Sequence, residues 1–281
     1  MTNQTHTMLN DIVQGKIIPY LGPGVLKYVT EIQTGAAMPA DSDSLIYGMT
    51  AGQAMSPRLM YEFPRAAMHL ENKKGRKFIE HYLTKTYAER QWHASAFHHW
   101  LASLQLPYLI DINRDSLLIS LYKDREHILV IGAARLTGSH YRYDLYHFCN
   151  DQYTQLDPAL MTNELPVLFK PYGAALPKAS FIASDADFVD YITELMGGFA
   201  IPPFLKSYRQ GKQYLFLGMR FNRDTEHMVM SEISFAASDQ GSWAMIPSPT
   251  DKELRFCQHK NIKILSEDWD ETLFPVKTNE V

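Results

Sequence analysis

The chain has 281 residues, of which 46% are hydrophobic, 12% aromatic and 21% charged. This composition excludes intrinsic disorder, because the apolar surface is sufficient to offset the loss of conformational entropy on folding. Lys and Arg number 27 against 31 Asp and Glu, so the net charge of −4 argues against a general nucleic-acid-binding surface. The length predicts a single domain, 1–281, with room for an inserted lobe.

The two cysteines, Cys149 and Cys257, are too few and too far apart for a four-cysteine zinc module or a disulfide framework. We therefore expect no metal site and a reducing, cytoplasmic location. The first ten residues lack the basic start and apolar run of a signal peptide. No stretch approaches the ~18 apolar residues of a membrane-spanning helix, so we expect a soluble protein without membrane contact.

Short apolar runs, each followed by Gly, Asn or a polar turn, predict seven buried strands. The stronger candidates are 17–21, 108–112, 127–131, 166–170 and 214–217, and the weaker ones are 243–246 and 262–265. Amphipathic patterns predict helices at 94–104, 186–196, 225–236 and 251–259, the last two with Asp224 and Thr250 as N-caps. Strands that alternate with helices predict an α/β fold with a doubly wound, mainly parallel sheet.

One region interrupts this alternation. Residues 58–71 and 75–86 both show helical patterns with no strand between them, which predicts a helical insert at about 58–87. Residues 35–57 are rich in Gly, Ala, Ser and Met and almost uncharged. A loop of that length in a domain is usually a lid or a mobile segment, and we expect one here.

A glycine turn follows the first predicted strand. Gly22, Pro23, Gly24 and Val25 lead into residues 26–32, which we expect to be helical. In open α/β sheets such a turn lets a phosphate approach the backbone N–H groups at a helix start. The spacing lacks the third glycine of the dinucleotide-binding fingerprint, so a plain strand-to-helix turn is the alternative.

Asn113 and Asp115 come directly after the second strong strand. Carboxyl ends of strands in such sheets face the ligand crevice, so both side chains are expected near the glycine turn. The alternative is that Asp115 only caps a helix, which leaves Asn113 unexplained.

Two later segments complete a pattern. The fourth strand ends in Lys-Pro-Tyr-Gly at 170–173, and the fifth is followed by Gly-Met-Arg-Phe-Asn-Arg-Asp at 218–224; between them lies the acidic helix start 185–191. In this order, with the glycine turn and the Asn113 segment, the chain resembles the sirtuin-like family, in its bacterial branch without the zinc module. The resemblance extends from 17 to about 273.

The resemblance implies a Rossmann-like fold whose crevice binds NAD or an ADP-ribose-type nucleotide. Enzymes of that family cleave the nicotinamide glycosidic bond, either to remove acyl groups from lysine or to hydrolyse NAD. Carried over by position, the expected cofactor-binding residues are Gly22, Pro23, Gly24, Val25, Asn113, Gly173, Gly218, Arg220 and Asp224. The expected catalytic residues are Asn113, Asp115 and Tyr172.

Two departures from the family pattern bear on activity. Tyr172 occupies the place of the family's general-base histidine, and a phenol with an ordinary pKa near ~10 is a poor base at neutral pH. Arg220 replaces a serine of the last motif and could clamp a phosphate or fill the pocket. A retained but altered nucleotide site, a pocket that no longer binds one, and a catalyst with another base all stay open.

Three hypotheses follow. The first is a protein that binds NAD or a related nucleotide without the standard deacylase activity. The second is an NAD glycohydrolase that uses Asn113 and Asp115, and the third is a protein-interaction scaffold with a vestigial crevice. A protein partner and homo-oligomerisation are left open. His93, His98 and His99 lack the i, i+4 spacing of a helical zinc site, and the aromatic run 141–146 alternates like an edge strand.

Overall fold

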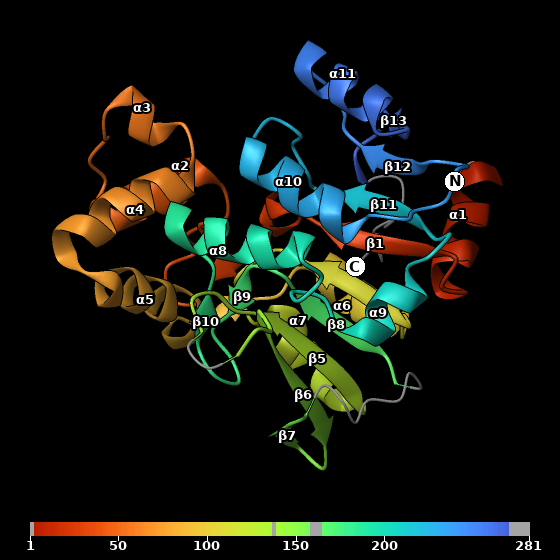
Figure 1. Cartoon of the computed structure of the whole chain (residues 1–281), viewed down its shortest axis with the longest axis horizontal. Coiled ribbons are helices and arrows are strands. Elements are labelled where there is room, and N and C mark those ends of the chain that lie inside the picture. The colour runs from red at the N-terminus through yellow and green to blue at the C-terminus, as the bar shows by residue number, and fades with distance from the viewer. Residues whose placement is uncertain (1–2, 137–138, 158–164, 270–281) are drawn as a thin grey trace, which may run out of the picture.

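A mixed sheet lies at the centre of the computed structural model, which describes residues 3–136, 139–157 and 165–269 (Figure 1). Its nine strands are ordered β13-β12-β11-β1-β4-β8-β5-β6-β7. Their bounds are β1 Ile17–Leu21, β4 Tyr108–Asp111, β5 His127–Gly132, β6 Tyr143–Cys149, β7 Gln152–Gln155, β8 Val167–Lys170, β11 Gln213–Leu217, β12 Ser242–Met245 and β13 Ile262–Leu265. All seven predicted strands are present, and they pair in parallel.

The remaining two strands form an antiparallel edge, since β6 pairs with β5 and β7 pairs with β6. The alternating aromatic run predicted an edge strand near this place, whereas β7 was not predicted. Three of its four residues are polar and exposed, and Tyr153 alone packs against the core, so the segment carries no hydrophobic pattern. The α/β class with a mainly parallel, Rossmann-like sheet is thereby confirmed.

Strand side chains alternate between two cores, one on each face of the sheet. In β1, Ile17 and Leu21 enter one core, and Ile18 and Tyr20 enter the other. The first core is covered by α1 Asn3–Val13, α6 Ala96–Ser103 and α7 Leu117–Leu121. The second is covered by α8 Asp185–Met196, α9 Pro203–Tyr208, α10 Asp224–Ile233 and α11 Asp251–His259. None of the described helices is both long and apolar enough to cross a membrane.

The region of the expected insert is helical. It contains α3 Pro57–Met60, α4 Phe63–Lys74, α5 Arg76–Thr84 and a π-helical turn, Lys85–Glu89. With α2 Ser42–Met49, these helices gather at one side of the sheet, next to α8 (Figure 1).

The expectation of a long loop at 35–57 was wrong. Helix α2 forms there because the Asp41 carboxylate accepts a hydrogen bond from the Ser44 N–H at 2.8 Å and caps the helix. Leu45, Ile46 and Met49 are then buried in the first core. Three apolar residues on one face are too few to show as a helical pattern in a segment dominated by small residues.

Two further local predictions were wrong. Residues 26–32 are not an α-helix: a 3₁₀ turn, Pro23–Leu26, leads to β2 Thr30–Glu31, which pairs with β3 Trp92–His93. Asp224 is the first residue of α10 and not its N-cap, which is Arg223. Thr250 does cap α11, in a reciprocal capping box with Glu253, as predicted.

Candidate functional site

The carboxyl ends of β11, β1 and β4 meet at one edge of the sheet. The chain passes from β1 to strands on one side and returns to β11 on the other, so the order of strands switches between β1 and β11. Ligands of open α/β sheets bind at such a switch point. Two cavities lie here.

The large cavity measures about 480 Å³ and lies between the glycine turn, the start of α2 and the segment 218–223. The small cavity measures about 40 Å³ and lies between Asn113, Tyr172, Glu62 and the start of α10. Pro23, Ala40, Ser42 and Glu226 line both, so the two cavities adjoin. Of these two cavities, the large one has the volume of a typical small-molecule site.

The glycine turn packs directly on the turn that follows β11. The Gly22 N–H donates to the Leu217 carbonyl and the Gly24 N–H to the Gly218 carbonyl, both at 2.8 Å. A Cβ on Gly24 would lie 2.9 Å from the Gly218 Cα, so the two glycines are needed for this close packing. Sequence reasoning assigned these N–H groups to a phosphate. In the structure they are already bonded within the protein.

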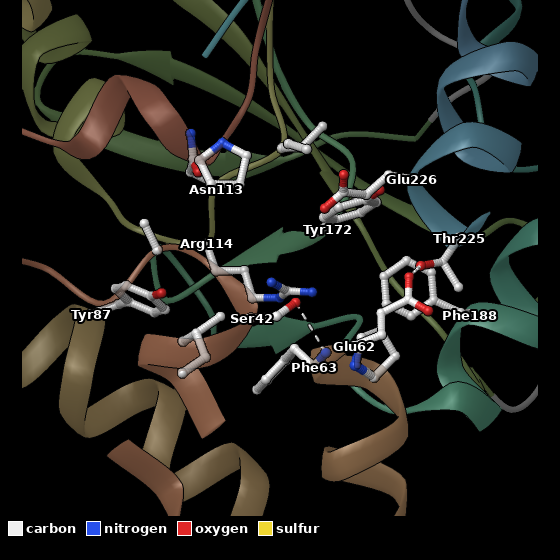
Figure 2. A pocket seen from close by; sticks show the side chains of 15 residues that line it. Ser42, Glu62, Phe63, Tyr87, Asn113, Arg114, Tyr172, Phe188, Thr225 and Glu226 are labelled. Carbon is white, nitrogen blue, oxygen red and sulfur yellow. Dashed lines mark hydrogen bonds between the residues drawn. The ribbon is translucent and has the colours of Figure 1, made fainter. Parts of the chain in front are cut away.

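Asn113 connects the glycine turn to the end of β4. Its Nδ2 donates to the Gly22 carbonyl at 3.1 Å and to Asp111 Oδ1 at 2.8 Å. Its backbone N–H donates to the same Asp111 oxygen at 3.0 Å. These bonds fix the orientation of the amide, and Asn113 lines the small cavity although it is only 5% exposed (Figure 2). The structure therefore places Asn113 near the glycine turn, as predicted.

Asp115 lies behind the cavity wall and lines neither cavity. Its Oδ1 accepts the Leu117 N–H at the start of α7, and its Oδ2 lies 3.8 Å from the Nζ of Lys170. Lys170 is fully buried and forms a 2.5 Å ion pair with Asp111 Oδ2. Burial raises the pKa of Asp111, and the ammonium group of Lys170 opposes this shift. This buried triad supports the loop that carries Asn113.

Tyr172 lines the small cavity with its ring under the guanidinium of Arg114, 5.2 Å from the ring centroid. The ring also contacts Phe188 edge-on at 5.1 Å. Its hydroxyl has no hydrogen-bond partner among the described residues. Burial raises the pKa of Tyr172 well above 10, and the nearby Glu226 adds to the shift. The phenol therefore stays protonated at neutral pH and can donate a hydrogen bond but not accept a proton.

Arg220 and Asp224 are engaged elsewhere. The Arg220 Nε lies 2.9 Å from Oε1 of the buried Glu253, so its charge is balanced although the side chain borders the large cavity. Asp224 is exposed, pairs with Lys252 at 3.5 Å and lines neither cavity. Gly173 follows Tyr172 but lines neither cavity. Its φ of +87° and a Cβ position 2.0 Å from the Ser180 carbonyl show a tight backbone turn, which explains the glycine.

Sequence reasoning missed three charged residues of the small cavity. Arg114 is buried, and its Nε and Nη2 both donate to the Ile182 carbonyl. Glu62, just before α4, accepts a hydrogen bond from the Thr225 hydroxyl (Figure 2). Glu226, from α10, lines both cavities and makes no hydrogen bond or ion pair with the described residues. The two glutamates are 164 residues apart in the chain, and neither belongs to a motif.

The pKa of Glu226 is raised to about 8, first by burial and then by the charge of Glu62, while Arg223 and Arg114 oppose the shift. The pKa of this carboxyl group is thus higher in the folded protein than in the unfolded chain, where it is near ~4.3. Its contribution to stability is complete below the unfolded pKa. This stability is lost as the pH rises through about 8. We expect Glu226→Gln to have a higher melting temperature than the wild type at pH 9 and a smaller difference at pH 5.

Differential scanning fluorimetry from pH 5 to pH 9 measures this difference. Glu89→Gln is the matched control, since Glu89 is exposed and outside both cavities, and it should follow the wild type at every pH. A Glu226→Gln difference that does not change with pH would contradict the raised pKa.

Comparison with protein-family models identifies the domain that carries this edge of the sheet. Residues 108–265 match the model of the SIR2-like domain, which is more than half of the chain. The matched range runs from β4 to β13 and therefore includes Asn113, Tyr172 and Glu226, whereas β1 and the glycine turn precede it. A search of curated proteins finds no match. With these strands in a mainly parallel α/β sheet and the cavities at its switch point, the chain belongs to the SIR2-like domain family.

Proposed function

We propose that the two adjoining cavities bind NAD or a related ADP-ribose-type nucleotide, and that the protein lacks the standard deacylase activity of zinc-containing sirtuins. A SIR2-like domain implies use of NAD. The observation that carries the proposal is the position of the Asn113 amide on the wall of the small cavity, at the junction of β1 and β4. Its hydrogen bonds to Gly22 and Asp111 hold it there. A pre-oriented amide at a switch point is suited to recognise a ribose or a carboxamide.

The phosphates of such a ligand need a cation, because the N–H groups of Gly22 and Gly24 are already used. Arg223 is the best candidate: it lines the large cavity, and its guanidinium lies 4.7 Å from the ring centroid of Tyr61 without an ion pair among the described residues. Arg220 would contribute only by sharing its charge with Glu253. Pro23, Gly24 and Gly218 would then shape the floor of the site rather than bind phosphate. Val25 is buried and lines neither cavity, so it would only support this floor.

We infer the absence of deacylase activity from Tyr172. Removal of an acyl group by this family's chemistry uses a base at the position that Tyr172 occupies here, and a buried phenol with a raised pKa cannot act as one. Asp115 would act through Lys170 and Asp111 to position Asn113. We also propose that the chain belongs to the bacterial branch without a zinc module, as one domain with the helices at 58–87 as an insert.

Calorimetry with NAD and with ADP-ribose tests the binding proposal. We expect Asn113→Ala to weaken binding at least tenfold, about 1.4 kcal/mol, because the amide's contacts with the ligand are lost. Asn72→Ala is the control, since Asn72 is exposed on α4 and remote from both cavities, and it should bind like the wild type. Absence of binding at millimolar ligand, or equal binding by Asn113→Ala, would contradict the proposal.

NAD hydrolysis is the second candidate, and Glu226 is the observation that favours it. Its carboxyl group faces both cavities, has no partner among the described residues and has a pKa of about 8, so it can exchange a proton near neutral pH. The reaction would convert NAD and water into nicotinamide, ADP-ribose and a proton. Chromatography would detect released nicotinamide, and Glu226→Gln should release much less. An unchanged NAD peak with wild-type protein would reject this candidate.

A further inference from the structure

A second group of chemically reactive side chains lies far from the cavities, at the amino end of β5. His127 pairs with Phe148 in the antiparallel ladder between β5 and β6, so the next pair along the ladder brings Glu126 to Cys149. His147 and Cys149 are two residues apart in β6 and therefore project from the same face of the sheet. The fold thus brings together a carboxylate from the residue just before β5 and an imidazole and a thiol from β6.

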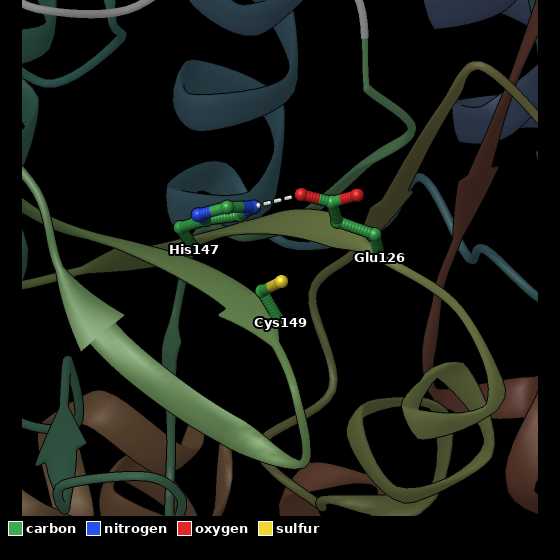
Figure 3. Close-up of side chains that lie close together, drawn as sticks. All are labelled: Glu126, His147 and Cys149. Carbon is green, nitrogen blue, oxygen red and sulfur yellow. Dashed lines mark hydrogen bonds and ion pairs between the residues drawn. The ribbon is translucent and has the colours of Figure 1, made fainter.

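The donor atoms of these three side chains converge (Figure 3). One carboxylate oxygen of Glu126, one ring nitrogen of His147 and the sulfur of Cys149 all lie within 4.8 Å of one another. The Nε2 of His147 is 2.7 Å from Oε1 of Glu126, so this pair is already oriented. Ligand atoms around a tetrahedral zinc ion are roughly 3.3 to 3.8 Å apart, as Zn–S and Zn–N bonds of ~2.3 and ~2.0 Å require. Small side-chain rotations would close the group around an ion.

We propose that Glu126, His147 and Cys149 form a site for a zinc-like transition-metal ion, with water as the fourth ligand. The donor set determines the type of metal, because a thiolate and an imidazole favour Zn²⁺ over Mg²⁺ or Ca²⁺, which prefer oxygen ligands only. From the sequence we expected no metal site because two cysteines are too few for a four-cysteine module. A site with mixed ligands is not subject to this limit. A His-x-Cys pair on a strand needs one cysteine and a residue from the neighbouring strand.

The site's place in the fold indicates a structural role. It lies at the amino end of β5, whereas the cavities lie at the carboxyl ends of the parallel strands, so the ion would not reach a nucleotide bound there. An ion bound to both β5 and β6 would hold the antiparallel edge against the parallel part of the sheet. Because it binds the folded ladder, it should raise the melting temperature with metal concentration. Metal binding here would therefore be independent of the proposed nucleotide binding.

The test is titration of the purified full chain with Co²⁺, a spectroscopic substitute for Zn²⁺, followed by competition with Zn²⁺. We expect one equivalent to give a thiolate-to-cobalt charge-transfer band and the visible bands of tetrahedral Co²⁺, with a Zn²⁺ dissociation constant of ~1 µM or below. Cys149→Ser should abolish the charge-transfer band, and His147→Gln should weaken binding at least tenfold.

Cys257→Ala is the matched control. Cys257 is a buried residue of α11, and burial raises the pKa of its thiol to about 12, so it should contribute nothing to the spectrum. Melting curves with and without Zn²⁺ provide a second readout: the wild type and Cys257→Ala should gain stability, and Cys149→Ser should not. No charge-transfer band, a band that persists in Cys149→Ser, or a melting temperature that Zn²⁺ does not change would overturn the proposal.

Discussion

Lys170→Met is expected to lower the free energy of unfolding by about 3–5 kcal/mol, the range for breaking a buried ion pair by removal of one partner. Lys170 is fully buried at the end of β8, 2.5 Å from Asp111 and 3.8 Å from Asp115. Without its ammonium group, two carboxylates would remain in the interior with no cation to balance them. Methionine matches the length of lysine, so the effect would arise from charge rather than from a cavity. Urea denaturation at pH 7 measures it.

Two further variants show whether charge is the cause. Lys170→Met combined with Asp111→Asn should recover part of the lost stability, because one of the two unpaired charges is gone. Lys77→Met changes an exposed lysine on α5 and should stay within about 0.5 kcal/mol of the wild type. If the single and double variants at Lys170 are equally unstable, the loss is one of packing and the argument from charge fails.

The second large effect is expected at Asp187 in the first turn of α8. We expect Asp187→Ala to cost about 2–4 kcal/mol, because a helix cap and two charge-assisted hydrogen bonds are lost together. Asp187 is buried and accepts hydrogen bonds from the Ala183 and Ser184 N–H groups at 2.9 and 3.0 Å. It also binds the guanidinium groups of Arg76 from α5 and Arg135 from the segment after β5.

The same cluster connects the helices of the insert region to the sheet. Arg135 also pairs with Glu71 at the end of α4, at 2.8 Å, and Arg76 donates to the Phe181 carbonyl at 2.8 Å. Loss of Asp187 should therefore loosen α4 and α5 first, which hydrogen exchange on the folded protein would show as faster exchange in those helices. Asp185→Ala is the control: Asp185 lies in the same helical turn, and its side chain makes no hydrogen bond or ion pair with the described residues. Equal stability losses in the two variants would refute a special role of Asp187.

The charge clusters around Lys170 and Asp187 could not be predicted from the sequence. Lys170 and the acidic start of α8 were recognised from the sequence only as parts of the sirtuin-like pattern. Their actual partners come from segments about 50 to 110 residues away in the chain, as in the pairs of Asp187 with Arg135 and Arg76. No local pattern predicts which buried charges meet, because each pairing depends on the order of strands in the sheet.

The candidate site divides in the same way. The position of Asn113 after a strand was enough to place it beside the glycine turn, since parallel strands bring their carboxyl ends to one edge. Asp115 also follows β4 and belongs to the same motif as Asn113, yet it lies behind the wall of the small cavity, 3.8 Å from Lys170. Glu62 and Glu226 belong to no motif. Both face the small cavity, where the Thr225 hydroxyl at the start of α10 donates a hydrogen bond to Glu62, just before α4.

The sequence by itself determined the parallel strands, the main helices and the family resemblance, because apolar runs and their spacing are local properties of the chain. It also predicted a ligand crevice at the ends of β1, β4 and β11, where the two cavities lie. Only the tertiary structure decided which polar groups are free to act there. The Gly22 and Gly24 N–H groups donate to the turn after β11, Arg220 is paired with Glu253, and the carboxyl group of Glu226 has no partner in the part of the chain that the structure describes. Hydrogen bonds and ion pairs inside a fold form between distant segments, so their allocation depends on packing and cannot be inferred from residue type and spacing alone.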